Sequence, residues 1–166
     1  MFEERKNGGT RQLVYMALLI ALSFVGSYIK ILGSIALDSL PGYFAAFYLG
    51  PVPGALVAGA GHIITAINSG FPYSLLIHII IMLGMALAAY LTGQVYRWAN
   101  GPLACLVAIL FNGPLMLGAL VPVTKKLGMK PGGQAFFLAL IAPLSLATLV
   151  NVLLAYLVFR LVKNRI

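Results

Sequence analysis

The feature that most constrains this chain is a succession of long apolar runs, separated by short breaks rich in glycine, proline or charge. Hydrophobic residues make up 61% of the 166 residues and charged residues only 8%, with a mean hydropathy of +1.01. Soluble domains contain about 25% charged residues. Runs of roughly 20 apolar residues also match the thickness of a bilayer. The sequence therefore predicts an all-α integral membrane protein.

The apolar runs predict six transmembrane helices in a compact bundle, which forms a single membrane domain of residues 12–161 between polar segments 1–11 and 162–166. The first run would give about 31 Å of helix, ending at Gly33. The second helix is expected to be short, because Pro51 and Pro53 lack the N–H groups that a continuing helix needs. The expected helices cover residues 12–32, 43–49, 54–67, 73–96, 103–120 and 134–161.

The basic residues predict the orientation of the chain. With six crossings both termini lie on one side, and that side would hold seven Lys and Arg residues against four on the other. Cytoplasmic segments carry the excess of Lys and Arg, so both termini are expected in the cytoplasm. Because these residues flank the apolar runs, the net charge of +8 of the chain indicates contact with the bilayer surface and not with nucleic acid.

Polar side chains within apolar runs are costly in lipid and usually face the interior of a bundle. Counting along the predicted helices places several of them in the outer half, where a small ligand could enter, and Asn112 near the middle of the membrane. Each could instead bond to a neighbouring helix, and the aromatic ones could belong to an interfacial belt. The candidate binding residues of this kind are Tyr43, Asn68, Tyr73, His78, Asn112 and Gln134.

Asp38 is the one carboxylate that lies among the apolar segments, because Glu3 and Glu4 are at the N-terminus. Asp38 or Ser39 could cap the helix expected to begin near Leu40. Alternatively, Asp38 lies in the first outer loop and accepts a hydrogen bond from a substrate. We include Asp38 among the candidate substrate-binding residues.

Catalytic and metal-binding chemistry has little support in the sequence. His62 and His78 are sixteen positions apart with no acid beside either, so they do not form a local metal site. The segment GPVPGALVAGAG lacks the Lys-Ser/Thr of a phosphate-binding loop, and its glycines fit close helix packing better. One acid near the membrane provides no pair for acid–base catalysis. We expect no enzymatic activity, no cofactor and no metal.

The first apolar run contains MALLIALS, in which Ala17 and Ala21 lie four residues apart on one helical face. Small residues at this spacing allow another helix to approach closely. The length, the six expected helices, this Ala-x-x-x-Ala and the loop before a short second helix together resemble the substrate-binding S component of an energy-coupling factor transporter. The segment GSIALDSLPGYFAAFYLGPVPGALVAGAGHIITAINSGFP is similar to S components for cobalamin precursors such as α-ribazole.

This resemblance implies a vitamin-uptake subunit in the plasma membrane of a prokaryote. It would bind its substrate near the outer face, dock through Ala17 and Ala21 onto a transmembrane T component driven by two ATPase subunits, and topple to release the substrate inside. Riboflavin and thiamin precursors fit the aromatic and amide residues as well as α-ribazole does. A stand-alone carrier, or a scaffold or enzyme subunit that binds no small ligand, are the other hypotheses.

Overall fold

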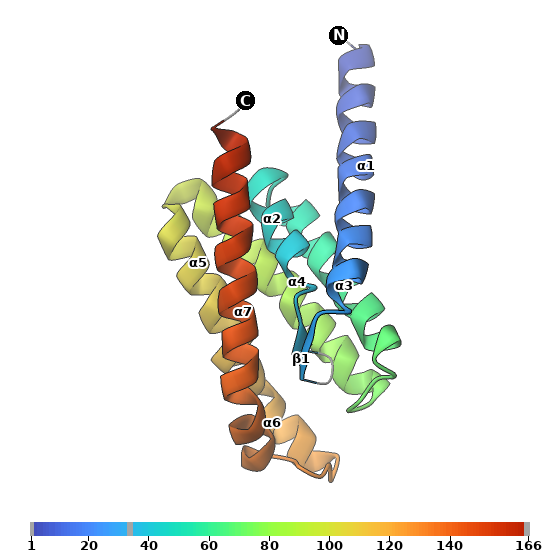
Figure 1. Ribbon diagram of the computed structural model, residues 1–166, viewed down its shortest axis with the longest axis vertical. Helices are drawn as coiled ribbons and strands as arrows, with labels where there is room; N and C mark the ends of the chain where they lie inside the picture. The colour runs from blue at the N-terminus through green and yellow to red at the C-terminus, as the bar shows by residue number, and fades with distance from the viewer. Residues whose placement is uncertain (1, 33–34, 165–166) are drawn as a thin grey trace.

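Helices account for nearly all of the regular structure in the computed structural model, which describes residues 2–32 and 35–164 (Figure 1). A two-stranded antiparallel hairpin, β1–β2, interrupts them after the first helix. The elements are α1 (Phe2–Gly26), β1 (Lys30–Leu32), β2 (Ile35–Ala36), α2 (Leu40–Tyr48), α3 (Pro51–Asn68), α4 (Leu75–Trp98), α5 (Gly101–Leu110), the π-helical turn η1 (Phe111–Leu115), α6 (Met116–Lys126) and α7 (Gln134–Lys163). Since α5, η1 and α6 are continuous, the described residues form six helical rods.

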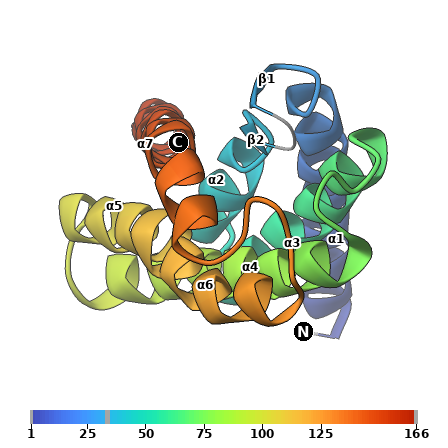
Figure 2. The ribbon, with the colours of Figure 1, turned by 90° about the horizontal axis from the view of Figure 1, so that it is seen from below.

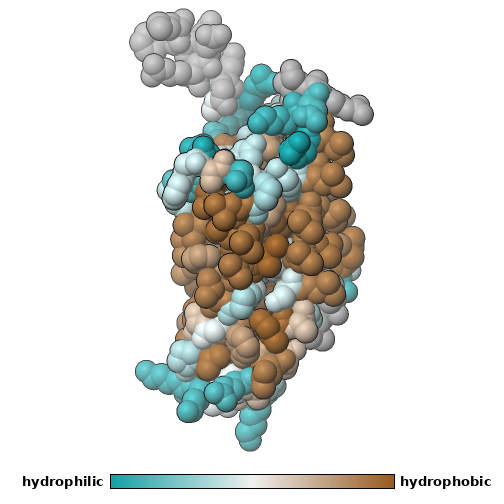
Figure 3. Space-filling view, turned by 90° about the vertical axis from the view of Figure 1, so that its left-hand side faces the viewer, coloured by the Kyte–Doolittle hydropathy of each residue, from teal (hydrophilic) through white to brown (hydrophobic). Residues whose placement is uncertain are grey.

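Four of these rods are long and apolar enough to cross a bilayer: Gly9–Gly26 of α1, Leu75–Trp98, Gly101–Lys126 and Gln134–Lys163. The face in Figure 3 shows an apolar band between two hydrophilic ends, as expected for a membrane-embedded protein. The nine residues of α2 span only about 13 Å, too little for a crossing. Four candidate spans are thus supported, and the predicted count of six is not confirmed.

The first helix ends earlier than predicted. α1 stops at Gly26, and Lys30–Leu32, expected to be helical, forms strand β1 paired with β2. The chain then folds back over the end of α1, where Leu37 N–H donates to Ile29 O at 3.1 Å. The Leu37 carbonyl occupies the space that a side chain on residue 26 would need, so only glycine fits there. An apolar run alone does not distinguish this hairpin from a longer helix. The predicted end point, Gly33, lies outside the described residues.

The fifth rod is longer than predicted. It runs from Gly101 to Lys126, which leaves a connection of residues 127–133 instead of the expected 121–133. Pro114 and Pro122 both lie inside it. Pro114 cannot donate a backbone hydrogen bond, and its ring would crowd the carbonyl of Leu110 in a regular helix, which accounts for the wider π turn at η1.

Small residues bring α2, α3 and α4 close together, as the glycine-rich segment predicted. A side chain at Gly42 of α2 would collide with Ala58 of α3, and one at Gly54 of α3 would collide with Ala46 of α2. Gly50, between these helices, has φ +111°, a conformation that side chains rarely adopt. The short helix α2 therefore lies among α1, α3, α4 and α7 (Figure 2), and six of its nine residues are buried.

The two ends of the bundle differ. The start of α1 and the end of α7 lie at one end, with the hairpin and the turns α3–α4 and α6–α7 at the other (Figure 1). We call these the terminal end and the hairpin end. A cluster including Tyr43, Phe47 and Phe159 packs toward the terminal end. A second cluster, which includes Ile77, Leu120 and Phe136, packs toward the hairpin end and contributes to the wall of a cavity.

Candidate functional site

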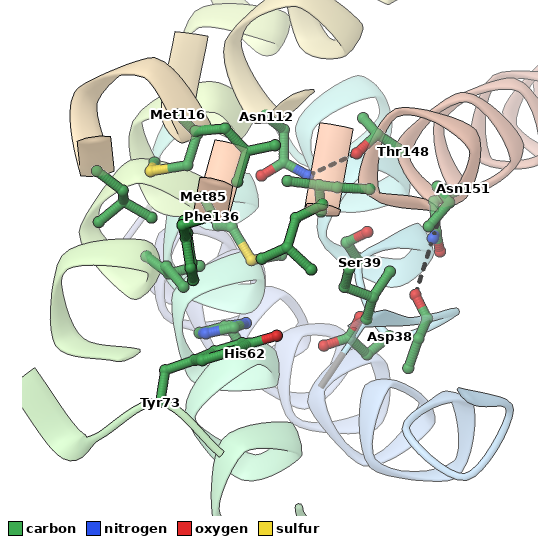
Figure 4. A pocket seen from close by; sticks show the side chains of 18 residues that line it. Asp38, Ser39, His62, Tyr73, Met85, Asn112, Met116, Phe136, Thr148 and Asn151 are labelled. Carbon is green, nitrogen blue, oxygen red and sulfur yellow. Dashed lines mark hydrogen bonds between the residues drawn. The ribbon is translucent and has the colours of Figure 1, made fainter. Parts of the chain in front are cut away.

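A cavity of about 60 Å³ lies inside the bundle toward the hairpin end (Figure 4). Side chains from β2, the β2–α2 turn, α3, α4, η1, α6 and α7 surround it, together with Tyr73 of the α3–α4 turn. Most of the wall is apolar. The lining residues are Ile35, Ala36, Asp38, Ser39, His62, Tyr73, Ile81, Met85, Asn112, Met116, Leu117, Leu120, Phe136, Leu140, Leu144, Ala147, Thr148 and Asn151. Small-molecule sites usually have this composition, with a few polar groups in an apolar concave surface.

Asp38 contributes the one carboxylate of this wall. It lies in the β2–α2 connection, outside the membrane-spanning helices, and is only 5% exposed. Its Oδ2 atom has no hydrogen-bond partner in the described part of the chain. Burial raises the pKa of Asp38 to about 6, although the Thr65 hydroxyl and the backbone N–H groups of Asp38 and Ser39 oppose this rise. The carboxylate is thus mostly ionised at neutral pH and lacks a partner for one oxygen.

Asn151 of α7 holds the backbone on both sides of Asp38. Its amide nitrogen donates to Ala36 O at 3.1 Å, and its Oδ1 accepts from Leu40 N–H at 2.9 Å. A third bond, from the amide nitrogen to Ala147 O at 2.8 Å, fixes the amide on its own helix. Residue 39 is the N-cap of α2 but makes no capping bond through its side chain, so the predicted capping by Asp38 or Ser39 is replaced by Asn151.

Two histidines form a buried pair beside the cavity. Nε2 of His62, on α3, lies 3.1 Å from Nδ1 of His78, on α4, and the rings stack with centroids 5.3 Å apart. The Tyr73 ring stacks on His78 at 6.4 Å and meets Phe136 edge to face at 5.1 Å. Only His62 of the pair lines the cavity. Together with Tyr73 and Phe136 it offers flat surfaces on which a ring system can pack.

A second polar pair lies across the cavity. Asn112 of η1 donates through Nδ2 to the Thr148 hydroxyl of α7 at 3.0 Å (Figure 4). Both side chains are buried. Because Asn112 lies in the π turn, the proline two residues later helps to determine how this amide is presented. The polar groups of the cavity thus come from opposite walls and leave apolar surface between them.

The structure brings three of the predicted binding residues to this cavity: Asp38, Tyr73 and Asn112. The other four lie elsewhere. Tyr43 is buried in the cluster toward the terminal end, and Asn68 donates to Ser27 Oγ at 3.1 Å. His78 contacts His62 on the side away from the cavity. Gln134 borders a separate surface hollow beside Lys125. None of these four is a lining residue.

Several lining residues were outside the predicted set, among them Ser39, His62, Met85, Thr148 and Asn151. His62, Thr148 and Asn151 are polar residues in apolar runs, so the sequence carried a signal for them. Counting along a helix, however, does not tell which polar residue faces a cavity and which faces a neighbouring helix. Met85 carried no signal, since methionine fills apolar gaps throughout cores.

The two alanines predicted as a docking site, Ala17 and Ala21, are both exposed on α1. The membrane-spanning part of α1 is only 6% buried. The buried side chains here are instead Ser23 of α1 and Ser27, the residue directly after this helix. The alanine face is thus open to lipid or to another helix.

The apolar, mostly helical bundle and the small, partly polar cavity inside it indicate a membrane-embedded protein that binds a small molecule. A family model described as "ECF transporter, substrate-specific component" matches residues 11–162, and the chain belongs to this family. No curated protein matches the sequence. Members of the family are transporter subunits and not enzymes, and they work with a T component and an ATPase module. The predicted class of the protein is confirmed.

Proposed function

We propose that this chain is the high-affinity binding subunit for uptake of a small vitamin or vitamin precursor, with α-ribazole or a related cobalamin precursor as the leading substrate. The observation that carries the proposal is the cavity at the hairpin end, with the unpartnered carboxylate of Asp38 in its wall. A ribose hydroxyl would donate to Asp38. A flat benzimidazole would pack against Tyr73, Phe136 and the apolar wall. Riboflavin and a thiamin precursor remain alternative substrates on the same grounds.

The size of the cavity implies that binding opens it. Sites for drug-sized ligands measure about 300–1,000 Å³, whereas this cavity of about 60 Å³ holds a few water molecules. β2 and the β2–α2 turn line the cavity and belong to none of the four candidate membrane spans. We infer that they move outward to admit the substrate.

We infer further that the chain crosses the plasma membrane of a prokaryote several times, with both termini in the cytoplasm and the cavity near the outer face. Arg97, Arg160 and Lys163 lie at the terminal end of α4 and α7, which agrees with the positive-inside rule. The exposed Ala17 and Ala21 would then face a T component, itself driven by two ATPase subunits. Such docking fits the small-residue face of α1.

Native mass spectrometry of the detergent-purified chain, followed by identification of any retained small molecule, tests the proposal. A stoichiometric heterocycle is the expected result. Asp38→Ala should then weaken binding about tenfold or more, a loss of about 1.4 kcal/mol. An empty protein that binds no vitamin in a thermal-shift panel would instead favour a stand-alone carrier or a scaffold. Equal affinities of the wild type and Asp38→Ala would exclude Asp38 from binding.

A further inference from the structure

The wall of the cavity contains an acidic side chain but no Lys or Arg. Among the eighteen lining residues Asp38 is the only acid, and no Lys or Arg is present. The four lysines of the hairpin end do not line it: Lys30 in β1, Lys125 and Lys126 at the end of α6, and Lys130 in the α6–α7 turn. An anionic group brought into this cavity would therefore meet a buried carboxylate and no cation.

His62 lines the cavity but is not an independent cation that could attract an anionic ligand. Its Nε2 is 3.1 Å from Nδ1 of His78, and this bond needs an unprotonated nitrogen on one of the two rings. The two rings together therefore carry at most one positive charge, and His78, which can carry it in place of His62, does not line the cavity. The Asn112 amide donates to the Thr148 hydroxyl, and the Asn151 amide donates to two backbone carbonyls.

Asp38 Oδ2 needs a hydrogen-bond donor as its partner. Five described residues carry a buried side-chain atom without a hydrogen bond, and Asp38 is the only one of them that lines the cavity. A buried acceptor without a donor costs about 1–3 kcal/mol, and more when it is charged. A ligand that donates N–H or O–H to this oxygen recovers that energy. A ligand that brings negative charge adds repulsion at low dielectric.

We propose that this cavity selects its ligand by charge: it accepts an uncharged or cationic heterocycle that donates a hydrogen bond to Asp38, and rejects anions, including the phosphate ester of the same heterocycle. This inference rests on the proposed function, because it assumes that the cavity is the substrate site. The chain would thus take up dephosphorylated compounds. An enzyme that removes phosphate must act before uptake on any phosphorylated source, and a kinase must act afterwards wherever the cell needs the ester.

The test uses matched pairs of compounds that differ only by one phosphate. The full-length chain in lipid nanodiscs is titrated at pH 7.5 with α-ribazole, riboflavin and thiamin, and with the monophosphate of each. The compound that binds best should be unphosphorylated, and its ester should bind about 100-fold more weakly, a ratio set by repulsion in a low-dielectric site. Asp38→Asn removes the charge but keeps the shape, and should reduce that ratio about tenfold or more.

Asn164→Lys is the matched control, since it changes the net charge by the same amount at an exposed position of the terminal end. It should leave the ratio of affinities unchanged. Two results would overturn the charge selection and leave the proposed function intact. One is an ester that binds as tightly as its parent compound. The other is an Asp38→Asn variant that still binds but has the same ratio of parent to ester affinity as the wild type. If none of the six compounds binds and no small molecule is retained on purification, the proposed function fails, and the charge selection fails with it.

Discussion

Two buried side chains, Asp38 and Asn151, determine the polar character of the cavity. Asp38 supplies the unpartnered oxygen, and Asn151 makes two hydrogen bonds that hold the segment on which Asp38 lies. Loss of Asn151 would leave a backbone N–H at residue 40 and a carbonyl at residue 36 without their partners. Binding should therefore respond to changes at either residue for different reasons, one electrostatic and one positional.

The ionisation of Asp38 predicts how affinity depends on pH. Its pKa is about 6 in the empty protein, and a ligand that donates a hydrogen bond to the carboxylate lowers this pKa further. The empty site then carries more protons than the occupied site between about pH 4 and 7, so affinity should rise with pH through this window and level off above it. Titrations from pH 4.5 to 8 measure the effect.

Other titratable groups lie near Asp38: Tyr43 on α2, and His62 and Tyr73 in the same cavity wall, with His78 bonded to His62. Histidine is the other residue type here whose ordinary pKa falls in this range, so the pair is the alternative source of a pH dependence. Asp38→Asn separates the contributions: the pH dependence should largely disappear in this variant. If it persists unchanged, the histidine pair and not Asp38 is its source.

Asn151→Leu should destabilise the protein and weaken binding. The substitution keeps the branching of the side chain but leaves two buried backbone groups unpaired, at a cost of about 1–3 kcal/mol. We expect a lower melting temperature in detergent and a lower affinity for any ligand of the wild type. Asn164→Leu, at an exposed position, is the control and should melt like the wild type. An unchanged melting temperature for Asn151→Leu would show that the β2–α2 turn is held by other contacts.

Among the elements, the long apolar helices could be predicted from sequence and the irregular parts could not. The runs that became α4 and α7 were placed within a few residues, because length and hydropathy decide a helix in lipid. The hairpin was missed because Ile31 and Leu32 continue the apolar run past its single charged residue, Lys30, and because the pairing depends on contacts with distant segments. The π turn was missed because the sequence predicted a regular helix through Pro114, and a proline inside a helix does not by itself distinguish a kink from a π turn.

The exposed face of α1 yields a prediction that binding and transport can be separated. Large residues in Ala17→Phe/Ala21→Phe would prevent a partner helix from approaching, while they lie far from the cavity walls. Uptake by cells that also express the T component and ATPases should be abolished, with ligand affinity within about twofold of the wild type.

Leu18→Phe/Leu22→Phe is the matched control on the same helix. Leu18 and Leu22 are 61% and 50% exposed and lie about 100° around the helix from the alanines. This pair should retain uptake. Loss of uptake in both double variants would point to a general requirement for the shape of α1 in lipid, and loss of binding in the alanine variant would place α1 in the substrate site.

The molecule as a whole has a cavity at one end and a solid core at the other. Tyr43, Phe47, Val152 and Phe159 are buried in the cluster that lies between the cavity and the terminal end. Gly42 and Gly54 leave α2 and α3 in contact along this region, with no space for an added methyl group. A ligand that enters from the hairpin end therefore meets this packed cluster before it can reach the other side. Interiors packed in this way shift between discrete arrangements and do not deform gradually.

This packing predicts that the isolated chain binds its substrate without moving it across a membrane. Opening a path for a vitamin-sized molecule would require separating α2 from α3 and α7, which would expose the buried cluster and cost far more than thermal motion supplies. A reorientation of the whole subunit by its partners avoids this cost, because the core stays intact. Liposomes with the chain alone should therefore bind labelled substrate but show no exchange across the membrane, and liposomes with the T component and both ATPases should accumulate it only with ATP. Exchange by the chain alone, at a rate that scales with its amount, would establish the stand-alone carrier instead.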